Sequence, residues 1–261
     1  DLHSFPTRRS SDLRVYDNVV VSDKAYIRVD DTVKALQAIG KYIRNRYDMP
    51  VVAVTGSVGK TTTREMITAA VSAGMKCFHT EGNYNSVYGE PITVSRMTDE
   101  YDAAVLELGI GEQGEMDILT DIAQPDICVI TTIGVAHIEY MGSLENTRKE
   151  KLSIINGMGE NGTLYINGDD PMLYAVKDEI PCKVYTYGCG EGMDFRATTL
   201  AGNTAKIRLH KIHKRDRNRQ TDTGPWHGRI HVSGIICRGK IRRSRLYSAD
   251  ACHNQKSDRS Q

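Results

Sequence analysis

Short apolar runs alternate with segments of helical periodicity along most of the chain. The most apolar runs, rich in Val, Ile, Leu and Ala, predict buried strands at residues 51–54, 103–108 and 127–132. Shorter runs predict further strands at residues 19–21, 76–79, 162–167 and 183–187. Helical spacing predicts helices at residues 30–47, 61–73, 87–96, 116–123, 144–158 and 170–176. Because strands and helices alternate, we expect an α/β fold in which helices cover both faces of a mostly parallel sheet.

The apolar run at residues 51–54 leads into a glycine-rich segment that is typical of a phosphate loop. Residues 51–63 read VVAVTGSVGKTTT, so a strand is followed by a tight loop and the first turn of a helix. Gly56 and Gly59 allow the backbone to turn its N–H groups toward an anion, and the helix start adds its positive dipole end. Lys60 would neutralise the β- and γ-phosphates, and the Thr61 hydroxyl would bind Mg²⁺.

The phosphates are expected to contact one continuous segment, namely Gly56, Ser57, Val58, Gly59, Lys60, Thr61 and Thr62. Its spacing differs from the usual G-x-x-x-x-G-K-[ST], because Val54 stands where the first glycine would be. An ordinary strand–turn–helix with an exposed lysine is the alternative. The position of Gly, Lys and Thr between a strand and a helix favours the phosphate loop.

Other polar residues follow predicted strands or lie on predicted helices. Glu107 ends an apolar strand, where its carboxylate could hold Mg²⁺ or simply be solvated. His137 follows another strand and could have a functional or a structural role. Asn83 and Asn85 lie in a polar loop that could be a turn or a substrate contact. Lys151 lies on a predicted helix, where a solvated charge is the default.

Together these features form an ordered pattern. The loop TGSVGKTTT is followed by TEGNYN, by Glu-Leu-Gly at residues 107–109, by IGVAHIE, and by Lys151 about fourteen residues after His137. From about residue 14 to about residue 210, the chain resembles the ATP-dependent Mur ligase family in the order and spacing of these motifs. Within that family it is most similar to the member that adds D-alanyl-D-alanine. The resemblance implies the P-loop NTPase-like central domain of a Mur ligase.

The resemblance also implies a reaction, in which an ATP-dependent ligase forms an amide bond during peptidoglycan precursor synthesis. ATP would phosphorylate the terminal carboxylate of UDP-N-acetylmuramoyl-tripeptide, and the amine of D-alanyl-D-alanine would then displace phosphate from the acyl phosphate. The catalytic residues implied are Lys60, Glu107, His137 and Lys151.

The metal and substrate contacts are implied in the same way. Thr61 and Glu107 would hold one Mg²⁺, and His137 would help to hold a second. The family carries a lysine carbamylated by carbon dioxide at the position of Lys151, which turns a cation into a metal-binding carboxylate. The two asparagines, Asn83 and Asn85, would face the muramoyl substrate.

Charge divides the chain, although the formal net charge is only +1. Residues 211–261 carry 13 Lys and Arg against 4 Asp, whereas the remainder carries 21 basic and 29 acidic residues. This basic segment has no useful periodicity and is interpreted as a disordered or non-native tail, with a nucleic-acid-binding tail as the alternative. Residues 1–13 are also interpreted as non-native or disordered, residues 14–48 as the end of an N-terminal substrate domain, and residues 49–210 as the ATP-binding central domain.

Composition indicates a soluble globular protein, because 26% of the residues are charged and 39% are hydrophobic. No apolar run approaches the roughly 20 residues that a membrane span needs. Six cysteines without a C-x-x-C pair indicate reduced thiols in the cytoplasm. We therefore expect a cytoplasmic monomer that binds small-molecule substrates, with neither a membrane nor a nucleic acid as partner.

The resemblance covers only part of a Mur ligase. We expect the early uridine-nucleotide-binding residues, the stretch that contacts adenine and the C-terminal domain that binds the incoming dipeptide to be missing. The chain alone should then keep its phosphate-loop geometry and ligate poorly or not at all. The alternatives are another Mur ligase, a folylpolyglutamate synthetase-like ligase, or a non-catalytic nucleotide-binding module whose basic tail contacts nucleic acid.

Overall fold

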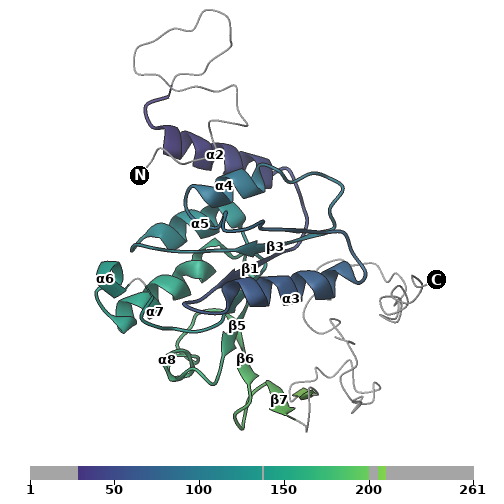
Figure 1. Ribbon diagram of the computed structural model, residues 1–261, viewed down its shortest axis with the longest axis vertical. Coiled ribbons are helices and arrows are strands. Elements are labelled where there is room, and N and C mark those ends of the chain that lie inside the picture. The colour runs from purple at the N-terminus through teal and green to yellow at the C-terminus, as the bar shows by residue number, and fades with distance from the viewer. Residues whose placement is uncertain (1–28, 137, 200–204, 210–261) are drawn as a thin grey trace, which may run out of the picture.

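One mostly parallel sheet forms the centre of the protein. The computed structural model describes residues 29–136, 138–199 and 205–209 (Figure 1). Within these residues, eight strands form the sheet in the order β2-β3-β1-β4-β5-β6-β7-β8. Neighbouring strands pair in parallel except β7 and β8, which are antiparallel. The strands are β1 (Val51–Thr55), β2 (Cys77–His79), β3 (Ala103–Glu107), β4 (Ile127–Ile130), β5 (Thr163–Asn167), β6 (Lys183–Gly188), β7 (Phe195–Thr199) and β8 (Ala205–Leu209).

Successive residues of the central strands point to opposite faces of the sheet. Val51 and Ala53 of β1 belong to one hydrophobic cluster, and Val52 and Val54 belong to another. Every residue of β1 and β3 is buried. These strands therefore appear in the sequence as continuous apolar runs, as expected of a parallel sheet that is covered on both faces.

Helices cover both faces of this sheet, which confirms the predicted fold class (Figure 1). On one face, α3 (Lys60–Ser72) packs its Ile67 against the cluster that contains Val52 and Val54. On the other face, the buried Leu119, Ile154 and Leu173 join the larger cluster. The elements that contribute to this second face are α5 (Glu115–Ala123), α7 (Leu144–Leu152), the 3₁₀ helix η2 (Ser153–Gly157) and α8 (Pro171–Tyr174).

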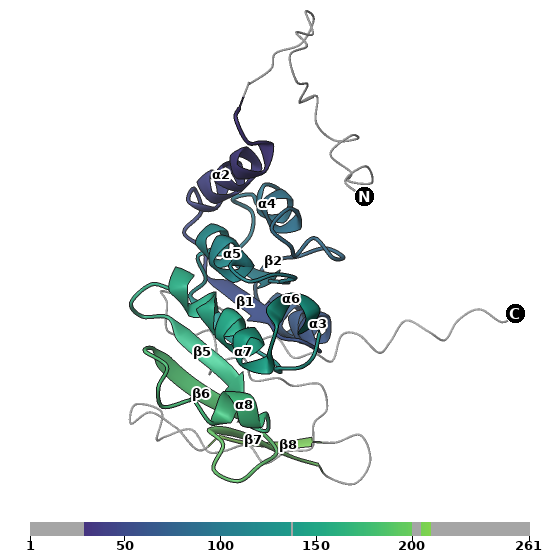
Figure 2. The ribbon, with the colours of Figure 1, turned by 90° about the vertical axis from the view of Figure 1, so that its left-hand side faces the viewer.

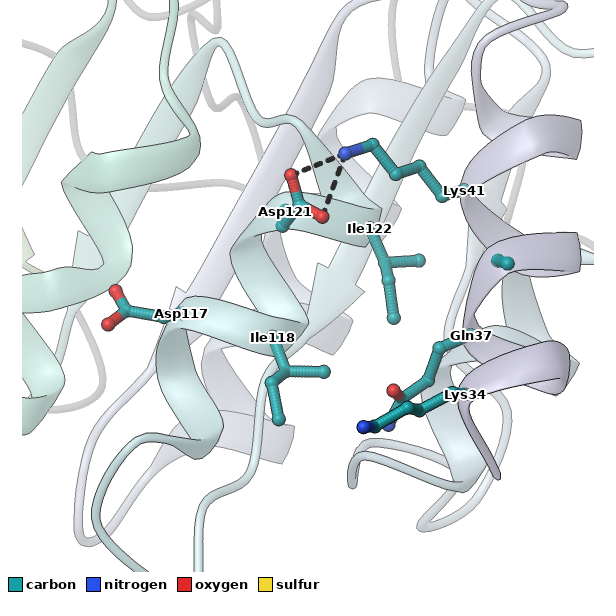
Figure 3. Close-up of a pocket in the computed structure, with 8 residues that line it drawn as sticks. Lys34, Gln37, Lys41, Asp117, Ile118, Asp121 and Ile122 are labelled. Carbon is teal, nitrogen blue, oxygen red and sulfur yellow. Dashed lines mark hydrogen bonds and ion pairs between the residues drawn. The ribbon is translucent and has the colours of Figure 1, made fainter. Parts of the chain in front are cut away.

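Two further helices, α2 (Thr32–Arg44) and α4 (Gly89–Val94), lie at the opposite end of the long axis from β7 and β8 (Figure 2). Lys41 of α2 forms an ion pair with Asp121 of α5 at 2.7 Å, across a groove between the two helices (Figure 3). The buried Arg44 donates a hydrogen bond to the carbonyl oxygen of Ala123 at 2.9 Å. These contacts hold α2, which leads into the phosphate-loop strand, against α5.

Most predicted elements are found within a few residues of their expected bounds. Asp31 caps α2 by accepting hydrogen bonds from the backbone N–H groups of Val33 and Lys34, and the helix ends at Arg44 rather than near Tyr47. The helix expected at residues 87–96 is limited to Gly89–Val94, and the one expected at residues 170–176 to Pro171–Tyr174. No helix among the described residues is both long and apolar enough to cross a membrane.

The single helix predicted for residues 144–158 is wrong in its second half. The α-helix α7 ends at Leu152, and residues Ser153–Gly157 continue as the 3₁₀ helix η2. Thr120 of α5 donates its hydroxyl to the carbonyl oxygen of Ile154 at 2.8 Å, so η2 is fastened to α5 rather than extended as an α-helix. The strands β7 and β8 and the short α6 (Ile138–Met141) were not predicted. The strand predicted at residues 19–21, and the interpretations of residues 1–13 and 211–261, lie outside the described residues.

Candidate functional site

The phosphate loop follows β1 at the carboxyl end of the sheet, where α/β proteins bind ligands. Gly56 has φ = +146° and Gly59 has φ = +86°, so both adopt backbone conformations that other residues rarely reach. A Cβ atom on Gly56 would come within 1.8 Å of the Thr131 hydroxyl, which follows β4. Glycine is therefore required at this position both for the backbone conformation and for the approach of the neighbouring strand.

Two N–H groups of the loop are already bonded to the segment after β4. Ser57 donates its N–H to the carbonyl oxygen of Thr132 at 2.9 Å, and Val58 donates its N–H to the Thr132 hydroxyl at 3.2 Å. The Ser57 hydroxyl also accepts a hydrogen bond from the N–H of Gly134 at 2.8 Å. Thr132 and Gly134 thus hold the loop in place, and the N–H groups of Ser57 and Val58 support the loop itself.

The first turn of α3 offers N–H groups to an anion instead. Gly59 is the N-cap residue and makes no side-chain capping hydrogen bond. The N–H groups of Lys60, Thr61 and Thr62 therefore open the helix without intrahelical partners and carry its positive dipole end. Lys60 folds back over the loop and donates from Nζ to the carbonyl oxygen of Gly56 at 2.9 Å. This arrangement provides a cationic nest of the kind that binds phosphate.

Glu107 lies at the end of β3, beside the start of α3. Its side chain is only 2% exposed, so the alternative of a solvated strand end is wrong. Glu107 Oε1 accepts hydrogen bonds from the Thr61 hydroxyl at 3.3 Å and from Asn85 Nδ2 at 2.8 Å. Glu107 Oε2 lies 3.2 Å from Arg64 Nη1, in an ion pair that is buried on both sides. One carboxylate therefore joins α3, β3 and the loop after β2.

Thr61 and Glu107 fit a magnesium site of the type that keeps most of its ligands from phosphate and water. Mg²⁺ binds oxygen at 2.0–2.1 Å in an octahedron, so two adjacent ligands lie about 3.0 Å apart. The 3.3 Å between the Thr61 hydroxyl and Glu107 Oε1 is close to that separation. Among the residues that the structure describes, no group of three or more His, Cys, Asp or Glu side chains could hold a metal.

Lys151 lies in the last turn of α7 and is 4% exposed, so the default of a solvated charge is wrong. Burial, together with the nearby Lys60 ammonium and against the opposing effect of Glu150, lowers the pKa of Lys151 to about 8. Glu150 accepts a hydrogen bond from the N–H of Met116 at 2.9 Å, which fastens α7 to the start of α5. A lysine in such surroundings has a substantial neutral fraction near neutral pH and is a potential nucleophile.

The two asparagines differ in their surroundings. Asn83 is exposed, whereas Asn85 is half-buried and directs its amide at Glu107. The N–H of Gly109 donates to the carbonyl oxygen of Asn85 at 2.8 Å, so the loop is also bonded to the chain after β3. Asn83 remains the better placed of the two for contact with a substrate. His137 lies outside the described residues.

The motifs of the sequence assign no role to three residues that the structure places at the site, namely Arg64, Thr132 and Asp170. Asp170 caps α8 through Oδ1 and accepts a hydrogen bond from the N–H of Ile133 through Oδ2 at 2.7 Å, which supports the segment that braces the phosphate loop. Arg64 lies one helical turn after Lys60, and this spacing could have placed it on the same face of α3. Thr132 and Asp170 gave no comparable signal, because their role depends on how the strands are ordered in the sheet.

Comparisons of the sequence and of the fold with known proteins point to the same family. The profile of the Mur ligase middle domain matches residues 54–233. A UDP-N-acetylmuramoyl-tripeptide–D-alanyl-D-alanine ligase from Bacillus subtilis (strain 168) is 42% identical over 172 residues. That match covers 66% of this chain and 37% of the relative. The chain thus spans little more than a third of the length of this relative.

Two solved structures share the fold. A crystal structure of MurF from Acinetobacter baumannii superposes with a TM-score of 0.66 at 31% identity, covering 76% of this chain and 44% of that one. MurF ligase from Thermotoga maritima in complex with ADP gives a TM-score of 0.67 at 28% identity, covering 73% of this chain and 45% of that one. Both similarities cover most of this chain and less than half of the solved proteins.

Proposed function

The chain belongs to the Mur ligase family, and on this premise we propose that it forms the ATP-binding part of a ligase that joins D-alanyl-D-alanine to UDP-N-acetylmuramoyl-tripeptide. One observation carries the proposal. The phosphate loop and the Thr61–Glu107 pair lie together at the carboxyl end of the sheet, and the charge of Lys60 in that loop acts on the buried Lys151. The relatives that bear the name of this ligase support the choice of substrates.

The first chemical step requires charge neutralisation and alignment more than proton transfer. An oxygen of the tripeptide carboxylate attacks the γ-phosphorus of ATP, the bond to the bridging oxygen breaks, and ADP leaves. The N–H groups of Lys60, Thr61 and Thr62 would hold the phosphates, and the Lys60 ammonium would offset the charge that develops on the transferred group. Lys60 Nζ donates one hydrogen bond to the carbonyl oxygen of Gly56, and its ammonium has two further N–H groups that could face the phosphates.

In the second step, the amine of D-alanyl-D-alanine attacks the carbonyl carbon of the acyl phosphate. The tetrahedral intermediate then expels inorganic phosphate, and the nitrogen loses a proton as the amide forms. Asn83 would contact the muramoyl substrate, and Asn85 would keep Glu107 oriented. These residues would fix the position of the carboxylate relative to the phosphate loop, which is the main contribution that an enzyme makes to such a transfer.

Thr61 and Glu107 would hold one Mg²⁺, and His137 and a carbamylated Lys151 would contribute to a second. When bound, the metal ions would neutralise phosphate charge. The lowered pKa of Lys151 supports carbamylation, because only the neutral amine attacks carbon dioxide. We also propose a monomer in the cytoplasm, and the cytoplasmic location agrees with the free thiols of the described Cys77, Cys128, Cys182 and Cys189.

Nucleotide binding by the chain is the first test. Titration calorimetry should detect ATP binding that Mg²⁺ strengthens, and Lys60→Met should reduce the affinity by at least about tenfold because a charged hydrogen-bond donor to phosphate is lost. Met66→Ala, at an exposed position of α3 outside the phosphate loop, is the matched control and should bind ATP as the unmodified chain does. Equal ATP affinity for Lys60→Met and the unmodified chain would contradict the phosphate loop.

The choice of substrate needs a second test. Residues 51–188 of this chain replace the equivalent segment of the Bacillus subtilis ligase, and phosphate release is measured with ATP, UDP-tripeptide and D-alanyl-D-alanine. We expect turnover that depends on all three substrates and disappears in the Lys60→Met chimera. A matched panel with single amino acids and folylpolyglutamate substrates distinguishes the sibling ligases. A folded chimera that binds ATP and releases no phosphate with any panel member would favour a non-catalytic nucleotide-binding module.

A further inference from the structure

The structure places one unassigned side chain, Arg64, between the proposed metal site and the proposed substrate loop. Arg64 lies on α3, three residues after Thr61, and its side chain is 4% exposed. We propose that Arg64 is a positioning residue that couples the loop of residues 82–85 to the Glu107 carboxylate and so sets the strength of Mg²⁺-dependent nucleotide binding. The inference rests on the proposed function.

The contacts of the guanidinium define this coupling. Arg64 Nη1 donates to the carbonyl oxygen of Gly82 at 3.1 Å and lies 3.2 Å from Glu107 Oε2. Arg64 Nη2 contacts the carboxylate of Glu65, which is largely exposed. A single nitrogen therefore bridges the loop after β2 and the carboxylate at the end of β3. Any displacement of that loop changes the position of the same nitrogen that faces Glu107.

Glu107 is held from both sides as a result. Arg64 forms an ion pair with Oε2, which has no hydrogen-bond partner among the described residues, whereas Oε1 accepts hydrogen bonds from the Thr61 hydroxyl and the Asn85 amide. Rotation of the carboxylate would break either the ion pair or these hydrogen bonds. Oε1 is thereby kept beside Thr61, in the orientation that a shared cation needs. The loop contributes through two of its residues, because Gly82 binds Arg64 and Asn85 binds Glu107 directly.

Burial makes the Arg64 contacts difficult to replace. The side chains of Arg64 and Glu107 are 4% and 2% exposed, so most water is excluded from the pair. Removal of the Arg64 charge leaves the buried Glu107 carboxylate without its ion-pair partner. Arg64 Nε is also buried and has no hydrogen-bond partner among the described residues. A lysine would supply one compact charge, whereas the planar guanidinium presents several donors in a fixed geometry. We therefore expect Lys at this position to restore only part of the coupling.

The test measures ATP affinity of the full chain with and without Mg²⁺, and takes the ratio of the two dissociation constants as the Mg²⁺ enhancement. Arg64→Met and Arg64→Gln should bind Mg²⁺-free ATP within about twofold of the unmodified chain, because the phosphate nest is intact. Their Mg²⁺ enhancement should fall to within about twofold of that of Glu107→Gln. Arg64→Lys should give an intermediate enhancement.

Thr68→Val is the matched control. Thr68 lies one turn further along α3, is buried, and its hydroxyl has no hydrogen-bond partner among the described residues. Its nearly isosteric replacement should change neither dissociation constant. Hydrogen exchange supplies a second readout, since the amides of residues 82–85 should exchange faster in Arg64→Met and at the unmodified rate in Thr68→Val.

The outcomes separate the inference from the function on which it rests. Absence of ATP binding by the unmodified chain would contradict the proposed function. An unmodified Mg²⁺ enhancement in Arg64→Met or Arg64→Gln, with normal ATP binding by the unmodified chain, would overturn the coupling alone. Equal loss of Mg²⁺-free and Mg²⁺-bound affinity in a folded variant would also overturn it, because that pattern indicates general damage to α3. Arg64→Met or Arg64→Gln alone, if the variant is folded, is enough to test the coupling.

Discussion

Lys151 is buried near the ammonium group of Lys60, and its reactivity follows from that placement. With a pKa of about 8, about a tenth of its amine is neutral at pH 7, against about three parts in ten thousand for an ordinary lysine. We predict that ¹³C-labelled carbon dioxide forms a carbamate on Lys151, with release of a proton, and that the signal grows as the pH rises from about 7 to 8.5. Carbon-13 NMR of the chain in labelled bicarbonate measures it.

Lys149 provides the control for this prediction, because it lies on the same helix two residues earlier and is exposed. Lys149→Ala should retain the carbamate signal, and Lys151→Ala should lose it. Persistence of the signal in Lys151→Ala would contradict the assignment. The pKa of Lys151 is depressed in the folded state, so its contribution to stability is present above about pH 10.5 and is lost as the pH falls through about 8. Lys151→Met should accordingly raise the melting temperature at neutral pH.

Glu90 is a buried carboxyl group whose side chain forms no hydrogen bond with the described residues. It is 1% exposed, and neither carboxyl oxygen has a hydrogen-bond partner among the described residues. Burial raises the pKa of Glu90 well above its ordinary 4.5. Stability contributed by this group is therefore present below about pH 4.5 and is lost as the pH rises toward the folded-state pKa. We predict that Glu90→Leu raises the free energy of unfolding at pH 8 by about 1–3 kcal/mol.

Thermal unfolding at several pH values tests the Glu90 prediction. The unmodified chain should lose stability between about pH 5 and pH 8 through this residue, and Glu90→Leu should lose less over the same interval. Glu112→Gln removes a carboxyl group that is exposed, and it should leave the pH dependence unchanged. Identical pH profiles of stability for Glu90→Leu and the unmodified chain would contradict the prediction. They would show that Glu90 loses its proton in the folded state without a loss of stability.

The junction between the 3₁₀ helix η2 and the helix α5 depends on a close approach of their backbones at Gly157 and Thr120. A Cβ atom on Gly157 would lie 2.2 Å from the carbonyl oxygen of Thr120, whereas a Cβ atom on Gly159 would meet nothing within 4 Å. We predict that Gly157→Ala lowers the free energy of unfolding by about 2–4 kcal/mol, because backbone must move. Gly159→Ala should change it by less than about 1 kcal/mol. Chemical denaturation of both variants gives the comparison, and equal stabilities would contradict the close approach.

The same junction shows where sequence patterns stop being sufficient. Apolar runs located β1, β3 and β4 closely, because both faces of these strands are buried and nearly every residue must be apolar. Helical spacing over residues 144–158 could not reveal that Thr120, in another helix, draws the chain into a 3₁₀ turn. The apolar alternation of residues 205–209 could have predicted β8, whereas β7, which has the same length, contains one large apolar residue, Phe195, and ends in two threonines.

The candidate site shows the same division between local and long-range information. The phosphate loop could be recognised because its residues are contiguous and each type has a physical role in binding phosphate. The burial of Lys151 and the hydrogen bond that Asp170 accepts from Ile133 could not be recognised in this way, since both depend on which strands are neighbours. Local periodicity carries no information on the order β2-β3-β1-β4, and this order brings Glu107 and the segment after β4 to opposite sides of the loop.

At the scale of the whole molecule, the charge distribution allows a different partner to be tested. Residues 211–261 hold an excess of nine positive charges, whereas the remainder is acidic. Attraction to a nucleic-acid backbone weakens steeply with salt, so a functional basic tail would give strong, salt-dependent binding. We predict instead that labelled DNA and RNA bind the chain weakly at about 0.15 M salt, and that ATP affinity is the same within about twofold for chains ending at residue 210 or 261.

Fluorescence anisotropy of single- and double-stranded probes, measured with both chains at two salt concentrations, decides between the partners. A third chain that ends at residue 233 keeps the whole segment that matches the Mur ligase profile. If ATP affinity falls only in the shortest chain, residues 211–233 support the nucleotide site and the tail interpretation is wrong for them. Submicromolar nucleic-acid binding that survives Lys60→Met and disappears with residues 211–261 would favour the nucleic-acid module. Weak binding of the nucleic-acid probes by all three chains would support the other partner. The phosphate nest in the acidic remainder would then bind nucleotides, and the chain would have no nucleic-acid partner.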